Sequence, residues 1–232
     1  MDLSVTDILV YYGVLLVSLV VHEAAHALAA LLGGDRTAYL GGQVTLNPLP
    51  HIRREPFGTV ALPLLTLFLG GFIMGYAHTP IDANWAYRHP RRAALMSAAG
   101  PLANLILVGI AFGVLKVLIA SGQAEAPYLH TTLIPPDYLT PIDGADSGPV
   151  FAAIRLAGVF MLLNVLLALL NMIPLPPLDG AGILEGLFPR SLRGIYSWIR
   201  SQPFMFILVI LLVLNVLPAV FVPAMSMLLS LL

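Results

Sequence analysis

The chain has 232 residues, of which 59% are hydrophobic and 10% charged, with a net charge of -1 and a mean hydropathy of +0.91. Soluble domains carry about 25% charged residues, so this composition excludes an ordinary soluble domain and predicts an integral membrane protein. The charge balance argues against nucleic-acid binding, and the lack of cysteine excludes disulfides and thiolate metal ligands. We expect one membrane-embedded, all-α domain over residues 1–232, with four to six transmembrane segments.

The first apolar segment, about residues 8–32, contains the motif His22-Glu23-Ala24-Ala25-His26. An ionisable side chain at the centre of a membrane helix costs about 2.5–3.5 kcal/mol on insertion scales and usually marks function. Positions i and i+4 of a helix share a face, so His22 and His26 can bind one zinc ion while Glu23 reaches a metal-bound water. The alternative is a pair of core histidines with a buried carboxylate, all of which would need polar partners.

Glycine, proline, β-branched and aromatic residues alternate over residues 36–56. This composition predicts short strands with turns, and we expect a small β-hairpin over residues 36–50. An exposed strand edge can pair with an extended peptide. We therefore assign Gly41, Gly42 and Val44 as substrate contacts.

The second apolar segment, Phe57–Tyr76, has basic residues on both flanks. Cytoplasmic loops carry an excess of lysine and arginine, so a single crossing would break the charge pattern. We expect the segment to dip into the membrane and return, turning near Gly70-Gly71. The alternative is an ordinary span that violates the charge rule.

Arginines gather in the loops that follow the first, second and fourth apolar segments, at Arg36, Arg53, Arg54, Arg88, Arg91, Arg92, Arg190, Arg193 and Arg200. Residues 121–149 contain acidic side chains and no lysine or arginine. By the positive-inside rule, the N-terminus lies outside and the histidine helix descends towards the cytoplasm. We expect a protein of the bacterial plasma membrane whose active site faces the cytoplasmic side.

The third apolar segment, about residues 93–120, contains Gly100-Pro101-Leu102-Ala103-Asn104, and a fifth covers about residues 204–232. Asn104 is assigned to the substrate-binding set. The alternative is a hydrogen bond between helices, the usual role of an isolated membrane asparagine.

The fourth apolar segment, about residues 150–172, ends in Asn171-Met172-Ile173-Pro174-Leu175-Pro176-Pro177-Leu178-Asp179-Gly180. Three prolines in four residues cannot continue a helix, and unwound backbone at membrane depth must line a covered cavity. Asp179 follows this proline break and can complete a three-ligand zinc site with His22 and His26, leaving one position for water. The alternative is an aspartate that caps the next helix.

The three motifs that contain His22, Asn104 and Asp179 resemble, in the same order, the three signatures of the site-2 protease family. The resemblance implies an intramembrane zinc metalloprotease that cuts single-pass membrane proteins. It implies that His22, His26 and Asp179 are the Zn²⁺ ligands and Glu23 the general base. Asn171 matches an asparagine that orients substrate or supports the oxyanion, and members carry a β-hairpin after the first motif.

The chain departs from well-known members of that family in two respects. The residues between the third and fourth segments are too few for a PDZ domain, and Ala181 stands where many members have a second glycine. We expect a minimal, prokaryotic-type member without a PDZ or C-terminal regulatory domain. A non-proteolytic membrane metal-binding protein or transporter is the alternative function. The sequence leaves both a monomer and a homo-oligomer open.

Overall fold

The computed structural model describes residues 4–70, 73–124, 148–202 and 205–232, and every regular element within them is helical. The elements in chain order are α1 (Val5–Leu32), α2 (Thr37–Leu40), α3 (Pro48–Arg54), the π-helical turn η1 (Phe57–Ala61), α4 (Leu62–Gly70), α5 (Ala83–Arg88), α6 (Pro90–Ala120), α7 (Pro149–Asn171), α8 (Asp179–Leu187), α9 (Pro189–Ser201) and α10 (Met205–Ser230).

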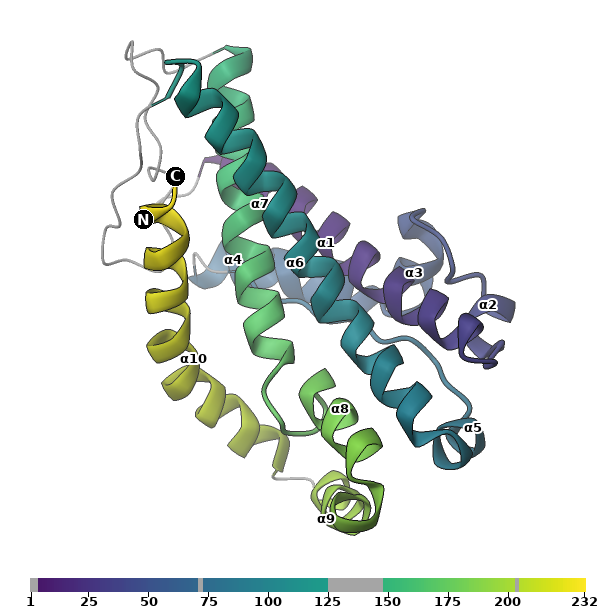
Figure 1. Ribbon diagram of the computed structural model, residues 1–232. Helices are drawn as coiled ribbons and strands as arrows, with labels where there is room; N and C mark the ends of the chain where they lie inside the picture. Colours follow the sequence, from purple (N-terminus) through teal and green to yellow (C-terminus); the bar gives the residue numbers. More distant parts are fainter. Residues whose placement is uncertain (1–3, 71–72, 125–147, 203–204) are drawn as a thin grey trace.

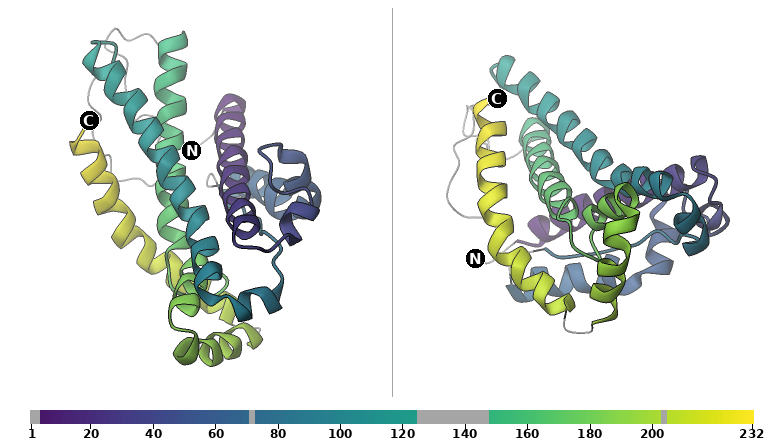
Figure 2. Two further views of the ribbon diagram at one scale, coloured as in Figure 1. Left: turned by 45° about the vertical axis from the view of Figure 1, so that its right-hand side comes forward. Right: turned by 60° about the horizontal axis from the view of Figure 1, so that its bottom comes forward.

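The helix α6 is the centre of the molecule, because it packs against α1, α7 and α8. Figure 1 and Figure 2 show α10 along α7, while α2 and α3 lie on the side of α1 that faces away from α7. Among the described residues, α1, α6 and α7 are long and apolar enough to cross a membrane. The described part of this membrane protein is therefore all-helical, and the count of four to six segments stays a prediction.

Local sequence sets the ends of these helices. Ser4 and Asp7 form a reciprocal capping box at the start of α1, and Gly33 ends that helix. A proline occupies the first turn of α6, α7 and α9, where its missing N–H costs nothing. Residues 172–178, after α7, are not helical, as the three prolines predict.

The predicted β-hairpin over residues 36–50 does not form, because α2 and α3 occupy this stretch. The carboxylate of Asp35 accepts a hydrogen bond from the Thr37 backbone N–H at 2.9 Å. The side chain of Asn47 caps α3 through the Leu49 N–H at 3.0 Å. These hydrogen bonds satisfy the first backbone N–H groups of α2 and α3, where the β-branched residues suggested strands.

The Phe57–Tyr76 segment folds back along itself. The Tyr76 N–H donates to the Gly58 carbonyl at 3.0 Å, and the Met74 N–H donates to Thr66 Oγ1 at 3.0 Å. This return path agrees with the expected dip and return. Residues 71–72 of the predicted turn, and residues 125–147 of the acidic loop, lie outside the described residues.

Candidate metal centre

Three side chains from two helices converge in the interior. His22 and His26 lie one turn apart on α1, and their Nε2 atoms are 3.0 Å apart. The Asp179 carboxylate, at the start of α8, lies 3.1 Å from His22 Nε2 and 3.3 Å from His26 Nε2. Both imidazoles are buried. The structure therefore brings together the three residues predicted as zinc ligands.

The donor set and its spacing fit a zinc ion. Zinc bonds to imidazole nitrogen and carboxylate oxygen at about 2.0–2.1 Å in a tetrahedron, which places neighbouring ligand atoms about 3.3 Å apart. The observed separations are 3.0–3.3 Å. Asp179 Oδ2 is buried and has no hydrogen-bond partner. Two imidazole nitrogens and a carboxylate in such a space require a positive charge, from protons or from a metal ion.

Asp179 is the first residue of α8, and Leu178 precedes it as the N-cap without a capping hydrogen bond from a side chain. Its carboxylate faces the imidazoles, so the capping alternative does not describe this residue. Burial disfavours the charged carboxylate, but the neighbouring imidazoles of His22 and His26 outweigh burial and lower the Asp179 pKa to about 2. The carboxylate is therefore ionised at neutral pH.

One face of α6 supports the two imidazoles. Asn104 Oδ1 lies 2.6 Å from His22 Nδ1, and the Met96 carbonyl lies 2.7 Å from His26 Nδ1. A carbonyl oxygen can only accept a hydrogen bond, so each Nδ1 carries a proton and each Nε2 keeps its lone pair for a metal. Between these two contacts, Gly100 lies against both rings: a Cβ there would be 2.6 Å from His22 Nε2.

Glu23 lies beside the two imidazoles, and its carboxylate oxygen and their ring nitrogens are all within 4.8 Å of one another. Thr79 Oγ1 lies 2.7 Å from Glu23 Oε2 and 3.0 Å from the Glu23 carbonyl, so the hydroxyl donates to this residue. No sequence pattern indicates Thr79, because it lies 56 residues from Glu23 in the irregular stretch before α5.

The other predicted site residues lie elsewhere or have other contacts. Asn104 is fully buried: its Oδ1 lies against His22 Nδ1 and its Nδ2 donates to Asn164, so the side chain serves an internal hydrogen-bond chain and its predicted substrate contact stays a prediction. The Asn171 side chain donates to the Leu167 carbonyl at 3.0 Å. The predicted contacts Gly41, Gly42 and Val44 lie in the turn between α2 and α3 instead of on a strand.

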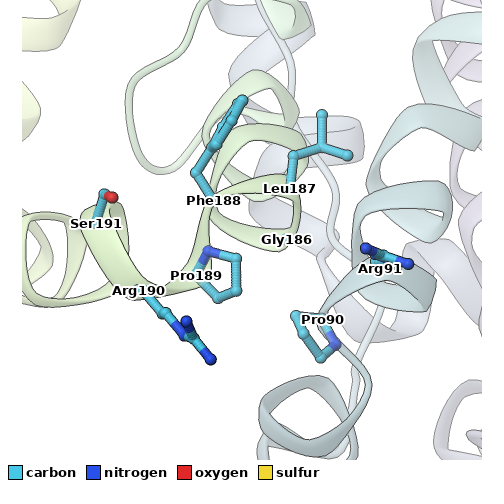
Figure 3. A pocket seen from close by; sticks show the side chains of 8 residues that line it. All are labelled: Pro90, Arg91, Gly186, Leu187, Phe188, Pro189, Arg190 and Ser191. Carbon is cyan, nitrogen blue, oxygen red and sulfur yellow. The ribbon is translucent and has the colours of Figure 1, made fainter.

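A separate cavity of about 300 Å³ lies where the start of α6 meets the junction of α8 and α9 (Figure 3). Its walls contain none of the metal-binding candidates. They are formed by Pro90, Arg91, Gly186, Leu187, Phe188, Pro189, Arg190 and Ser191.

Sequence comparisons agree on one family. The family model for peptidase family M50 matches residues 10–215. The chain is 36% identical over 198 residues to "Putative zinc metalloprotease YwhC" of Bacillus subtilis, a match that covers 84% of this chain and 77% of YwhC. It is 30% identical over 204 residues to "Putative zinc metalloprotease Rip2" of Mycobacterium tuberculosis H37Rv, covering 88% of this chain and 65% of that protein. No solved structure matches the chain.

Proposed function

The chain belongs to peptidase family M50 and is a zinc metalloprotease, and from this we propose that it cleaves single-pass membrane proteins within or near their transmembrane segments. The observation that carries the proposal is the meeting of the buried His22 and His26 with the partly buried Asp179, whose ligand atoms are 3.0–3.3 Å apart beside Glu23. This group is built on α1, a helix long and apolar enough to cross a membrane. A peptidase centre in such a helix is suited to substrates that share its bilayer.

In this proposal His22, His26 and Asp179 hold the zinc ion, which when bound polarises the scissile carbonyl and acidifies a water molecule. Glu23 takes the proton of the attacking water and returns it to the leaving amine. Thr79 donates to Glu23 Oε2 and so helps to hold the carboxylate in place for this proton transfer. Asn171 is the residue assigned to the oxyanion or to substrate orientation, and that role stays a prediction.

The substrate must unwind before Glu23 can act on it. A transmembrane helix holds each peptide group in an intrachain hydrogen bond, and the site is buried among helices. Glycine and proline weaken a helix by about 1 and 3 kcal/mol per residue. We therefore expect cleavage to favour transmembrane segments that contain them near the scissile bond.

We also propose that the site faces the cytoplasmic side of a bacterial plasma membrane. His22 lies ten residues before Leu32, the end of α1, which is about 15 Å along the helix. The loops at this end carry most of the arginines, including Arg36, Arg53 and Arg92. The positive-inside rule then puts this end in the cytoplasm.

The test uses the purified protein and a single-pass model substrate in liposomes. We expect about one zinc ion per chain, and we expect Glu23→Gln to keep this zinc but lose cleavage, because the amide cannot accept the water proton. Glu185→Gln is the matched control, since Glu185 pairs with Arg200 at 2.9 Å and should cleave normally. Normal cleavage by Glu23→Gln would refute the mechanism. Zinc binding without cleavage by the wild type would favour a metal-binding or transport protein.

A further inference from the structure

A chain of buried polar side chains runs from the metal centre into the helix bundle. Asn104 Oδ1 lies 2.6 Å from His22 Nδ1, and Asn104 Nδ2 donates to Asn164 Oδ1 at 2.7 Å. Asn164 Nδ2 in turn donates to Ser18 Oγ and to the Phe160 carbonyl, both at 2.9 Å. Ser18, Asn104 and Asn164 are all 0% exposed and come from α1, α6 and α7.

The direction of every hydrogen bond in this chain follows from one backbone atom. The Phe160 carbonyl can only accept, so Asn164 must turn its Nδ2 towards it. That places Asn164 Oδ1, another atom that can only accept, against Asn104. Asn104 must therefore present its Nδ2 to Asn164 and its Oδ1 to His22, which leaves the proton on His22 Nδ1.

The two histidines differ in how this proton is fixed. His26 Nδ1 faces the Met96 carbonyl directly, and a helix carbonyl cannot rotate. His22 faces an amide side chain, whose two ends are nearly equal in shape and can exchange places by rotation. An exchanged Asn104 would offer an N–H to His22 Nδ1, and the proton of His22 would then lie on Nε2, the atom that faces Asp179.

We propose that Asn164 is a positioning residue of the metal centre: it locks the Asn104 amide, which keeps the Nε2 lone pair of His22 directed at the metal. The inference rests on the proposed zinc ligation by His22. It explains why the interior of α7 carries an asparagine among apolar residues. Asn164 contacts neither metal nor substrate, and acts only through Asn104.

The first test is the zinc affinity of Asn164→Leu, measured by competition with a chromophoric chelator. Loss of groups that orient a metal ligand typically weakens metal binding about 10–100-fold, and we expect a loss in this range. Asn215→Leu is the matched control, because the exposed Asn215 of α10 makes the same bond to the carbonyl four residues earlier, Leu211, at 2.7 Å. It should bind zinc like the wild type.

Two further variants separate positioning from general stability. Burial favours the protonated form of an aspartate at position 164, so in Asn164→Asp the carboxyl O–H can donate to the Phe160 carbonyl while the other oxygen faces Asn104. This variant should lose less zinc affinity than Asn164→Leu. Asn164→Ala removes the amide without adding bulk and serves if the leucine does not fit. Unchanged zinc affinity in folded Asn164→Leu or Asn164→Ala would overturn the proposal, as would an equal loss in Asn164→Asp.

The tautomer itself can be observed in zinc-free protein with ¹⁵N-labelled histidine, at a pH where the imidazoles are neutral. We expect the single ring proton of His22 to lie on Nδ1 in the wild type. In Asn164→Leu we expect a mixture of the Nδ1–H and Nε2–H tautomers. His22→Gln identifies the signals of His22. A wild-type proton on Nε2 would overturn the proposal. These readouts do not depend on cleavage, so a wild type that binds zinc but cleaves nothing would refute the proposed function alone.

Discussion

Replacing Gly100 with alanine tests whether the imidazoles must lie directly on the backbone of α6. The added Cβ would lie closest to His26 Nε2 and 2.6 Å from both Cε1 and Nε2 of His22, whereas ordinary contacts are 3.4–4 Å. His22 would therefore have to move by about 0.8 Å, the difference between 2.6 and 3.4 Å. Metal–ligand distances tolerate about ±0.2 Å, so this displacement removes His22 from the ligand set. We expect zinc affinity to fall by more than about 100-fold, and cleavage to fall with it.

The assay compares zinc affinity and thermal unfolding of the zinc-free protein. Alanine is favoured over glycine inside a helix by about 0.5–1 kcal/mol, so α6 itself should not be weakened. Gly109→Ala and Gly113→Ala are matched controls on the same helix, because a Cβ at either position has nothing within 4 Å. Wild-type zinc affinity in Gly100→Ala would refute the packing argument, and equal losses in the controls would point to α6 as a whole.

The catalytic base, the zinc ion and the connection between α1 and α2, which contains Asp35, can each be tested. Thr79→Val removes the hydroxyl that donates to Glu23. Because a hydrogen bond to a charged group contributes about 1.5–3 kcal/mol, kcat should fall at least about tenfold, while zinc affinity measured by chelator competition stays unchanged. Removing zinc with a chelator should abolish cleavage and lower the unfolding temperature, and added zinc should restore both. Burial opposes ionisation of Asp35, but hydrogen bonds from Thr37 and the Asp82 N–H lower its pKa. The ionised Asp35 therefore stabilises the folded state above the ordinary aspartate pKa, and this stabilisation is lost as the pH falls through the lowered pKa. At pH 7 the Asp35→Asn protein should therefore unfold at a lower temperature than the wild type. The difference between the two unfolding temperatures should narrow as the pH is lowered below 4.

The metal-binding candidates could be found from sequence because helix geometry links residues four apart. His22 and His26 needed only the rule that i and i+4 share a face. Asp179 needed a second physical argument, that the proline break ends α7 and exposes unwound backbone. The structure brings its carboxylate to the two imidazoles, at 3.1 and 3.3 Å. The long apolar helices were also predicted closely, since α6 and α7 begin and end within about three residues of the expected limits.

The β-hairpin failed for a different reason. β-branched and aromatic residues favour strands only where a neighbouring strand and a packed face support them. Residues 36–50 have no strand partner in the described part of the chain, and Asp35 and Asn47 instead satisfy the first N–H groups of α2 and α3. Such side-chain hydrogen bonds are local interactions, so they outweighed a strand preference that depends on tertiary contacts.

The residues that support the ligands lay beyond any local pattern. Thr79 is 56 residues from Glu23, and Asn164 is 60 residues from Asn104 and 146 from Ser18. An asparagine in an apolar helix indicates a hydrogen bond between helices, but not its partner or direction. The direction matters here, because the unrotatable Phe160 carbonyl determines which atom of His22 carries the proton. A histidine pair on one helix predicts a metal site, whereas the protonation that makes it a ligand pair is set by α6 and α7, which only the fold brings to α1.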